Sequence, residues 1–261
     1  MIAVQLQGGL GNQLFQYATA RALAYESRQI PYLDTSLLLD KAAHRPYYLS
    51  AFPIRATVST NRLRRWFFHR FQKPLLQIID ESDQPIPIPA DRIYLKGYWQ
   101  NPSYFNAIKP MLQQEISLPV PLHASLDKIE NRLRVGVHVR RGDFAGHSLH
   151  EVCDADYYLK AMDAIRHTID GCKFFVFSDD IAFCKAIFSG LDNIVFVEET
   201  DTVRSFLLLK SCTHFVLSNS SFSWWAQYLR NEPGMVIAPI FWLRNKPTLE
   251  MPLYQPHWKL I

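Results

Sequence analysis

A short strand that runs into charged residues is the part of the sequence best suited to chemistry. Alternating valines predict this strand over 135–139. Arg140, Arg141, Gly142 and Asp143 follow it directly. Ligands of open α/β sheets collect at the C-terminal ends of strands, and guanidinium groups bind phosphate oxygens in pairs. The sequence therefore predicts an anion site here, with a solvated surface turn as the plainer alternative.

A serine-rich run at 217–225 forms a second candidate site. It reads Leu-Ser-Asn-Ser-Ser-Phe-Ser-Trp-Trp and joins an expected strand over 215–217 to an expected helix over 221–230. Hydroxyls and backbone N–H groups at a helix N-terminus favour an anion. A simple N-cap needs only one serine, whereas this run has four serines and an asparagine in six positions. We therefore expect it to bind a ligand.

Two adjacent aspartates, Asp179 and Asp180, follow an expected buried strand over 174–177. One of them is expected to cap the helix predicted over 180–189. The other carboxylate would then be available at the ligand edge of the sheet. Such a carboxylate accepts paired N–H bonds from a base such as guanine.

The N-terminal stretch repeats the order of strand, glycine turn and helix. A strand is predicted over 2–6, and Gly9 and Gly11 lie in the turn, where backbone N–H groups can face a ligand. Asn12 is expected to cap the following helix. The spacing is not a dinucleotide fingerprint, because a third glycine and a ribose-binding acid are missing. A bare turn is the alternative.

Aromatic and amide side chains follow another expected strand, over 93–95. The stretch 97–101 reads Gly-Tyr-Trp-Gln-Asn, and a helix is expected after it over 103–116. Carbohydrate sites combine rings that stack on sugars with amides that bind hydroxyl groups. Tyr98 and Trp99 are therefore candidates for sugar contact, and their packing in the core is the equal alternative.

These candidate residues require a framework of strands alternating with helices. Beyond 131, further strands are expected over 194–197 and 235–238, with helices over 154–168 and 201–211. This alternation predicts an α/β fold with parallel sheets. Three parts are expected: an N-terminal domain over 1–130, a C-terminal domain over 131–243, and a tail over 244–261 that crosses back to the first domain.

Composition narrows the class of protein. The chain has 261 residues, 48% apolar content and a net charge of +4, which is too weak a basic balance to indicate nucleic-acid binding. The four cysteines are scattered, so free thiols in a reducing cytoplasm are expected. The sequence shows no secretory leader and no apolar run long enough to span a membrane.

A basic aromatic insertion lies near 55–75. Its centre, 62–71, reads Arg-Leu-Arg-Arg-Trp-Phe-Phe-His-Arg-Phe, and 41–79 contains no acidic residue. The plainer interpretation is a helix whose aromatic side chains pack on the domain. The alternative is peripheral contact with an anionic membrane surface, which would place the protein on the inner face of the membrane.

Four ordered stretches, 8–17, 97–100, 138–143 and 218–225, resemble motifs of the bacterial α-1,2-fucosyltransferases of glycosyltransferase family 11. The resemblance implies a GT-B-type fold of two Rossmann-like domains facing a cleft, with the acceptor side on the first domain and GDP-fucose bound by the second. It implies inverting transfer of L-fucose from GDP-β-L-fucose to the 2-hydroxyl of a terminal β-galactose, in surface polysaccharide or O-antigen synthesis. It implies donor contacts at His138, Arg140, Arg141, Asp179, Ser218, Asn219, Ser220, Ser221 and Phe222, and acceptor contacts at Gly9, Gly11, Asn12, Gln13 and Trp99.

Catalysis would depend on stabilising the leaving phosphate. Arg140 is expected to supply the main donor, and two arginines, serines and a helix dipole would take the place of a metal ion. Asp143 and His150 are the first candidates for the general base, with His138, His147 and Glu151 nearby. The alternatives are another GDP-sugar transferase, an α-1,6 or protein-O fucosyltransferase, or a non-catalytic nucleotide-sugar-binding module.

Overall fold

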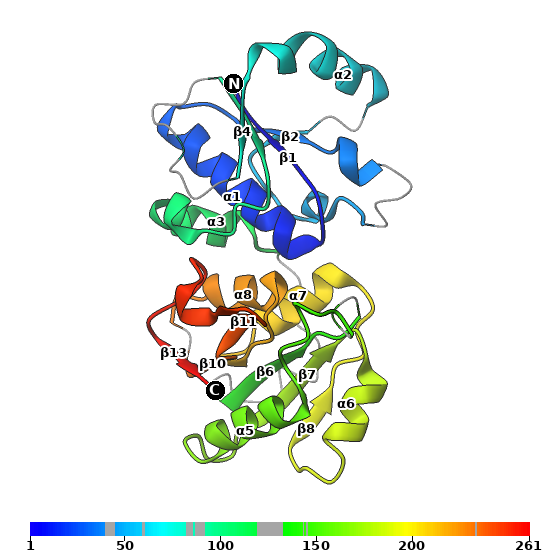
Figure 1. Cartoon of the computed structure of the whole chain (residues 1–261), viewed down its shortest axis with the longest axis vertical. Coiled ribbons are helices and arrows are strands. Elements are labelled where there is room, and N and C mark those ends of the chain that lie inside the picture. The colour runs from blue at the N-terminus through cyan, green and yellow to red at the C-terminus, as the bar shows by residue number, and fades with distance from the viewer. Residues whose placement is uncertain are drawn as a thin grey trace. The chain divides into compact units, whose positions relative to one another are not determined.

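The chain folds into two compact units, Met1–Leu118 and Pro119–Ile261, each built around its own sheet (Figure 1). The structure is a computed structural model and describes residues 1–261 except 40–44, 59–60, 82–85, 87–91, 119–132, 143, 145 and 233. Every strand pairing within the two main sheets is parallel, which confirms the predicted α/β class.

The first unit has a five-stranded sheet in the order β3-β2-β1-β5-β4. Its strands are β1 (Ile2–Gln5), β2 (Tyr32–Asp34), β3 (Thr57–Val58), β4 (Gln77–Asp80) and β5 (Ile93–Lys96). Its helices are α1 (Leu10–Glu26), α2 (Arg62–Phe67) and α3 (Lys109–Glu115). The first strand and helix were predicted from their apolar patterns, whereas β2 and β4 were not.

Two expectations about local structure in this unit are corrected. The helix expected over 103–116 is two 3-10 turns, Pro102–Tyr104 and Asn106–Ile108, followed by α3. Pro110 lies in the first turn of α3, where its missing N–H is tolerated, so the regular helix starts there. Helix α1 is capped by Gly9 without a side-chain bond, so Asn12 lies inside the helix and is not its cap.

The second unit has a six-stranded sheet in the order β13-β10-β9-β6-β7-β8. The strands are β6 (Arg134–Val139), β7 (Lys173–Ser178), β8 (Ile194–Phe196), β9 (His214–Val216), β10 (Val236–Ala238) and β13 (Trp258–Leu260). The helices are α5 (Ala155–Arg166), α6 (Ile181–Ile187), α7 (Thr202–Lys210) and α8 (Ser221–Tyr228). A small antiparallel pair, β11 (Phe241–Leu243) and β12 (Lys246–Pro247), precedes β13.

The two faces of β6 have different partners, because side chains alternate across a strand. Val135, Val137 and Val139 join a buried cluster that includes residues of α5 and α6. Gly136 lies on the opposite face, where an added Cβ would come 2.6 Å from Cδ1 of Leu209 in α7. Glycine therefore lets α7 approach the sheet closely. Figure 1 shows α5 and α6 on one side of this sheet and α7 and α8 on the other.

The tail over 244–261, which was expected to cross back to the first domain, contributes an edge strand to the second unit. Its last strand, β13, pairs in parallel with β10 and becomes the edge of the second sheet. The indole N–H of Trp224 in α8 also donates to the Leu253 carbonyl at 2.8 Å. Backbone pairing and a buried indole bond therefore fix the tail within the C-terminal unit.

Candidate active site

The second sheet reverses its strand order beside β6. The chain runs from β6 through β7 to β8 on one side, and then from β9 through β10 to β13 on the other. Such a switch point leaves room at the C-terminal ends of the two central strands, and open α/β sheets bind ligands there. The loops that follow β6, β7 and β9 carry the charged and serine-rich motifs predicted to bind the donor.

His138, the penultimate residue of β6, joins two of these motifs. Its Nδ1 lies 2.8 Å from Oγ of Ser218, and its ring stacks on Phe222 with centroids 5.1 Å apart. His138 and Ser218 are both buried. Burial and the nearby Arg140 cation lower the pKa of His138 to about 3. The imidazole is therefore neutral at ordinary pH and is a weak base for the acceptor proton.

The buried neutral His138 predicts a dependence of stability on pH. The unfolded chain protonates this imidazole below roughly pH 6.5, whereas the folded protein does not until about pH 3. The free energy of unfolding should therefore lose about 1.4 kcal/mol per pH unit as the pH falls between these values. Urea unfolding at pH 7 and pH 5 should show this slope in the wild type and not in His138→Gln. The exposed His167→Gln should keep the wild-type slope, and an unchanged slope in His138→Gln would contradict the assignment.

Arg140 and Asp179 form the closest charged pair at this edge. Nη1 of Arg140 lies 2.6 Å from Oδ2 of Asp179, and the side chains are 22% and 28% exposed. The other carboxylate oxygen accepts the Arg141 backbone N–H at 2.9 Å. A Cβ at Gly142 would lie 2.5 Å from Oδ2, so this carboxylate sits against the glycine. Both oxygens of Asp179 thus orient the loop after β6, a role that the sequence did not reveal.

Arg141 and Asp180 make a separate pair. Nε of Arg141 lies 3.3 Å from Oδ2 of Asp180, and its guanidinium lies 3.8 Å from the Phe183 ring centroid. Asp180 also accepts the Phe183 N–H at 3.0 Å and caps α6, so the prediction that one of the two aspartates is a helix cap is confirmed. Arg141 is consequently held against α6, which leaves Arg140 as the better placed donor for a phosphate.

The serine-rich loop contains side chains that hold the structure together and the residues that start helix α8. Asn219 is buried and donates to the carbonyls of His150 and Trp242, at 3.0 and 2.9 Å. Its side chain and that of Ser218 therefore hold loops together. Ser220 caps α8, accepting the Phe222 N–H at 3.3 Å, and Ser221 is the half-buried first residue of the helix. The start of α8 is the part of this motif able to bind an anion.

Asp143 and His150 are the two expected catalytic residues besides Arg140, and the structure describes only one of them. Asp143 lies outside the described residues. The ring of His150 stacks on Phe144 with centroids 4.7 Å apart and lies 4.6 Å from the ring of His147. The ring of Phe144 also lies 5.5 Å from the Arg140 guanidinium. Phe144, which the sequence did not single out, therefore connects His150 to the charged pair.

The first sheet also reverses its order, between β1 and β5. The turn after β1 carries Gly8, which has a φ of +76° and where an added Cβ would come 2.6 Å from Nδ2 of Asn12, so both features favour glycine. Gly9 caps α1 and has open space where a Cβ would lie, whereas Gly11 is buried inside the helix. The side chain of Asn12 accepts a hydrogen bond from Nε2 of Gln100 at 2.9 Å. The two predicted polar stretches of this unit therefore meet.

Gln13 and Trp99, both expected to contact sugar, are buried side chains in this structure. Gln13 is fully buried: its amide donates to the carbonyls of Gly8 and Pro46, both at 2.9 Å, and accepts the Tyr48 N–H at 3.0 Å. Trp99 is 1% exposed, so its ring has no free face. The neighbouring Tyr98 is exposed.

Glu81 is a polar residue of this edge that the sequence analysis did not select. Glu81 accepts the backbone N–H groups of Tyr98, at 2.6 Å, and Gln100, at 3.2 Å. A Cβ at Gly97 would come 2.4 Å from the Cβ of Glu81. Gly97 is the one sequence signal for this contact. A glycine indicates that another group comes close to the backbone, but it does not identify that group as Glu81.

The buried amide of Gln13 gives a test of its structural role. Gln13→Met removes three hydrogen bonds and leaves their backbone partners unpaired, so the free energy of unfolding should fall by about 3 kcal/mol. Denaturant titration measures this loss. Asn12→Ala, at a half-buried neighbour, should cost much less stability. A stable Gln13→Met protein that had lost only acceptor affinity would restore the sugar-binding role.

The described residues give no sign of a metal centre or a membrane-spanning helix. Within the described ranges, no group of three or more His, Cys, Asp and Glu side chains is placed to hold an ion. In the same part of the chain, no helix combines the length and apolar character needed to cross a bilayer.

Comparison with known proteins identifies the family. The whole chain, residues 1–261, matches the family described as Glycosyl transferase family 11. An alpha-1,2-colitosyltransferase of Escherichia coli is 29% identical, over 94% of this chain and 93% of its own. Galactoside alpha-(1,2)-fucosyltransferase 2 of Mus musculus is 26% identical, over 96% of this chain and 75% of its own.

The fold is similar to that of a solved enzyme. The crystal structure of fucosyltransferase NodZ from Bradyrhizobium matches with a TM-score of 0.53 and 14% identity, over 86% of this chain and 91% of the other. This likeness supports the predicted GT-B-type fold of two Rossmann-like units. Together with the match over the whole length, it shows that the chain is a glycosyltransferase and belongs to glycosyl transferase family 11.

Proposed function

We propose that the protein transfers L-fucose from GDP-β-L-fucose to the 2-hydroxyl of a terminal β-galactose, with inversion at the anomeric carbon. One observation carries this proposal. Arg140 follows β6 and the start of α8 follows β9, and these two strands flank the switch point of the second sheet. A guanidinium and a helix N-terminus are both suited to a diphosphate. The family relationship indicates which sugar the diphosphate carries.

The reaction requires stabilisation of charge on the departing phosphate. The acceptor oxygen forms a bond to the anomeric carbon while the bond from that carbon to the β-phosphate oxygen breaks, and GDP leaves with the electron pair. Arg140 donates to the β-phosphate, and Ser220, Ser221 and the N–H groups of α8 hold the other oxygens. These groups supply positive potential from the chain itself, so we propose that transfer needs no metal ion.

Asp179 has two proposed roles. The carboxylate orients Arg140 through the 2.6 Å contact and fixes the loop through the Arg141 N–H. Each of its oxygens keeps a further lone pair, so the same carboxylate can also accept from the guanine base. The second role makes the enzyme prefer GDP to inosine diphosphate, which lacks the exocyclic amine.

The acceptor hydroxyl must lose its proton as the new bond forms. The neutral, weakly basic His138 is not suited to accept it. His150 and Asp143 stay as the proposed bases, His150 because Phe144 connects it to Arg140. The galactose-terminated glycan is proposed to bind at the C-terminal edge of the first sheet, where Asn12 and Gln100 meet beside the exposed Tyr98.

Colitose is the competing donor sugar, because the Escherichia coli relative that is 29% identical is an alpha-1,2-colitosyltransferase. Synthesis of a surface polysaccharide or O-antigen in the cytoplasm is the proposed setting for either sugar. The residues around Arg140 do not distinguish the two donors, because Arg140 is proposed to contact the diphosphate and not the sugar.

A GDP-release assay tests this proposal. Purified protein with GDP-fucose, lactose and EDTA should release GDP, and NMR of the product should show fucose α-linked to O2 of galactose. Parallel reactions with GDP-colitose and GDP-mannose rank the donors. Faster turnover with GDP-colitose than with GDP-fucose would identify colitose as the donor sugar. Dependence on added Mn²⁺ would contradict metal-independent transfer. GDP binding without turnover on any galactoside would indicate a silent binding module.

A further inference from the structure

The segment Arg62–Leu75 exposes an unusual set of large apolar side chains. Leu63 is 75% exposed, Trp66 59% and Phe71 47%, and Phe67 and Leu75 are also exposed. They surround each other, with the rings of Trp66 and Phe67 5.6 and 5.1 Å from the ring of Phe71. We call this segment the basic aromatic surface. It is firmly attached, because Phe68 is buried and stacks on Tyr32 of β2 with centroids 4.1 Å apart.

The charge of the basic aromatic surface has one sign. The sequence from 41 to 79 contains no acidic residue. Arg62, Arg64 and Arg70 are exposed, and no carboxylate among the described residues pairs with them. The Arg70 guanidinium lies 5.4 Å from the Phe71 ring centroid, so a cation sits directly beside the exposed aromatic rings. Cations interleaved with exposed aromatics suit an interface between anionic headgroups and acyl chains.

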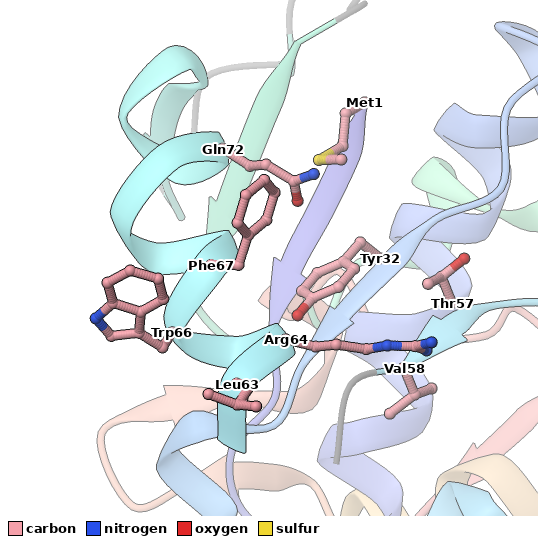
Figure 2. A pocket seen from close by; sticks show the side chains of 9 residues that line it. All are labelled: Met1, Tyr32, Thr57, Val58, Leu63, Arg64, Trp66, Phe67 and Gln72. Carbon is pink, nitrogen blue, oxygen red and sulfur yellow. The ribbon is translucent and has the colours of Figure 1, made fainter. Parts of the chain in front are cut away.

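A pocket opens under the same segment. It has a volume of 510 Å³ and is lined mainly by apolar side chains. Figure 2 shows Phe67 and Met1 at one end and Arg64 beside Val58 at the other, with Tyr32 between them, and Trp66 also lines the pocket. An apolar pocket with a guanidinium beside it fits an apolar chain that carries an anionic head.

We propose that the basic aromatic surface docks the protein on an anionic lipid bilayer, with the pocket receiving part of one lipid acyl chain. Trp66, Phe71 and Leu75 enter the interface while the arginines contact lipid phosphates. A second copy of the chain is a poorer occupant, because a symmetric contact would bring arginines against arginines. This inference does not depend on the donor or acceptor sugar, and its tests use vesicles without substrate.

Vesicle flotation tests the charge requirement. The full-length protein should float with vesicles of phosphatidylcholine and phosphatidylglycerol at low salt, and neither with phosphatidylcholine alone nor at 1 M NaCl. The triple variant Arg62→Gln, Arg64→Gln, Arg70→Gln should partition about 100-fold more weakly. A control variant with Arg28→Gln, Lys246→Gln and Lys259→Gln removes the same charge from exposed positions elsewhere and should bind normally. Equal loss in both variants would overturn the proposal.

Tryptophan fluorescence tests which surface enters the bilayer. Trp66 is exposed, whereas Trp99, Trp224, Trp225, Trp242 and Trp258 are all buried. Lipids brominated along the acyl chain should therefore quench the protein's emission only through Trp66. Trp66→Phe should retain vesicle binding and lose the quenching. Binding without quenching in the wild type, or a salt-stable homodimer that is disrupted by Trp66→Ser with Phe71→Ser, would overturn the proposal.

Discussion

We expect Arg140→Ala to lower kcat for sugar transfer about 1,000-fold while the protein keeps its fold. The guanidinium follows β6 at the switch point and is partly exposed, so it can reach a phosphate. One preorganised donor at a developing oxyanion contributes about 100- to 1,000-fold, and a charged fork lies at the upper end of that range. Initial rates of GDP release at saturating donor and acceptor measure the loss.

The controls for Arg140→Ala separate charge from structure. The exposed Arg204 of α7 pairs with Glu199 at 3.2 Å, so Arg204→Ala removes the same kind of side chain away from the loop and should be nearly fully active. Arg140→Lys keeps the charge without the planar fork and should be intermediate. Retention of more than roughly a tenth of wild-type activity by Arg140→Ala, with an unchanged unfolding midpoint, would contradict the role at the phosphate.

Asp179→Ala is expected to lower kcat/KM about 100-fold, because the variant frees Arg140 from the 2.6 Å contact that orients it. The informative measurement is a double-mutant cycle with Arg140→Ala. If Asp179 acts through Arg140, the double variant should be no worse than Arg140→Ala alone. If the carboxylate acts only on the guanine base, the two losses should multiply.

The preference for GDP over inosine diphosphate tests the second proposed role of Asp179, the contact with the guanine base. The wild type should bind GDP more tightly than inosine diphosphate, since a carboxylate acceptor recognises the exocyclic amine of guanine. Asp179→Asn should reduce this preference. An undiminished preference in that variant would remove the base contact and leave Asp179 as a positioning residue for Arg140.

The C-terminal framework was predictable because its signals are local. Buried parallel strands such as β6 and β7 appear as apolar runs, and the residues after them must lie at one edge of the sheet. The contact between Arg140 and Asp179 follows from that geometry, since Val139 pairs with Ser178 and the two charged residues come next. That Asp179 engages the arginine proposed to be catalytic became clear only from the structure.

The features that the sequence did not predict depend on contacts between residues that are far apart in the chain. Gln13 looked like a sugar contact because an amide in a glycine turn carries no sign of the carbonyl at Pro46 that it binds. The sequence around Trp99 looks the same whether its ring packs in the core or stacks on a sugar. The tail was misplaced because three residues of β13 carry almost no local signal and are fixed by pairing with β10.

The most direct test of the account is a crystal structure of the protein with GDP bound. We predict that the β-phosphate contacts the Arg140 guanidinium and that phosphate oxygens accept hydrogen bonds from Ser220, Ser221 and the first N–H groups of α8. The base should lie on the side of β7, near Asp179. A diphosphate bound away from Arg140 and from the start of α8 would contradict the central claim, whatever the activity of the variants.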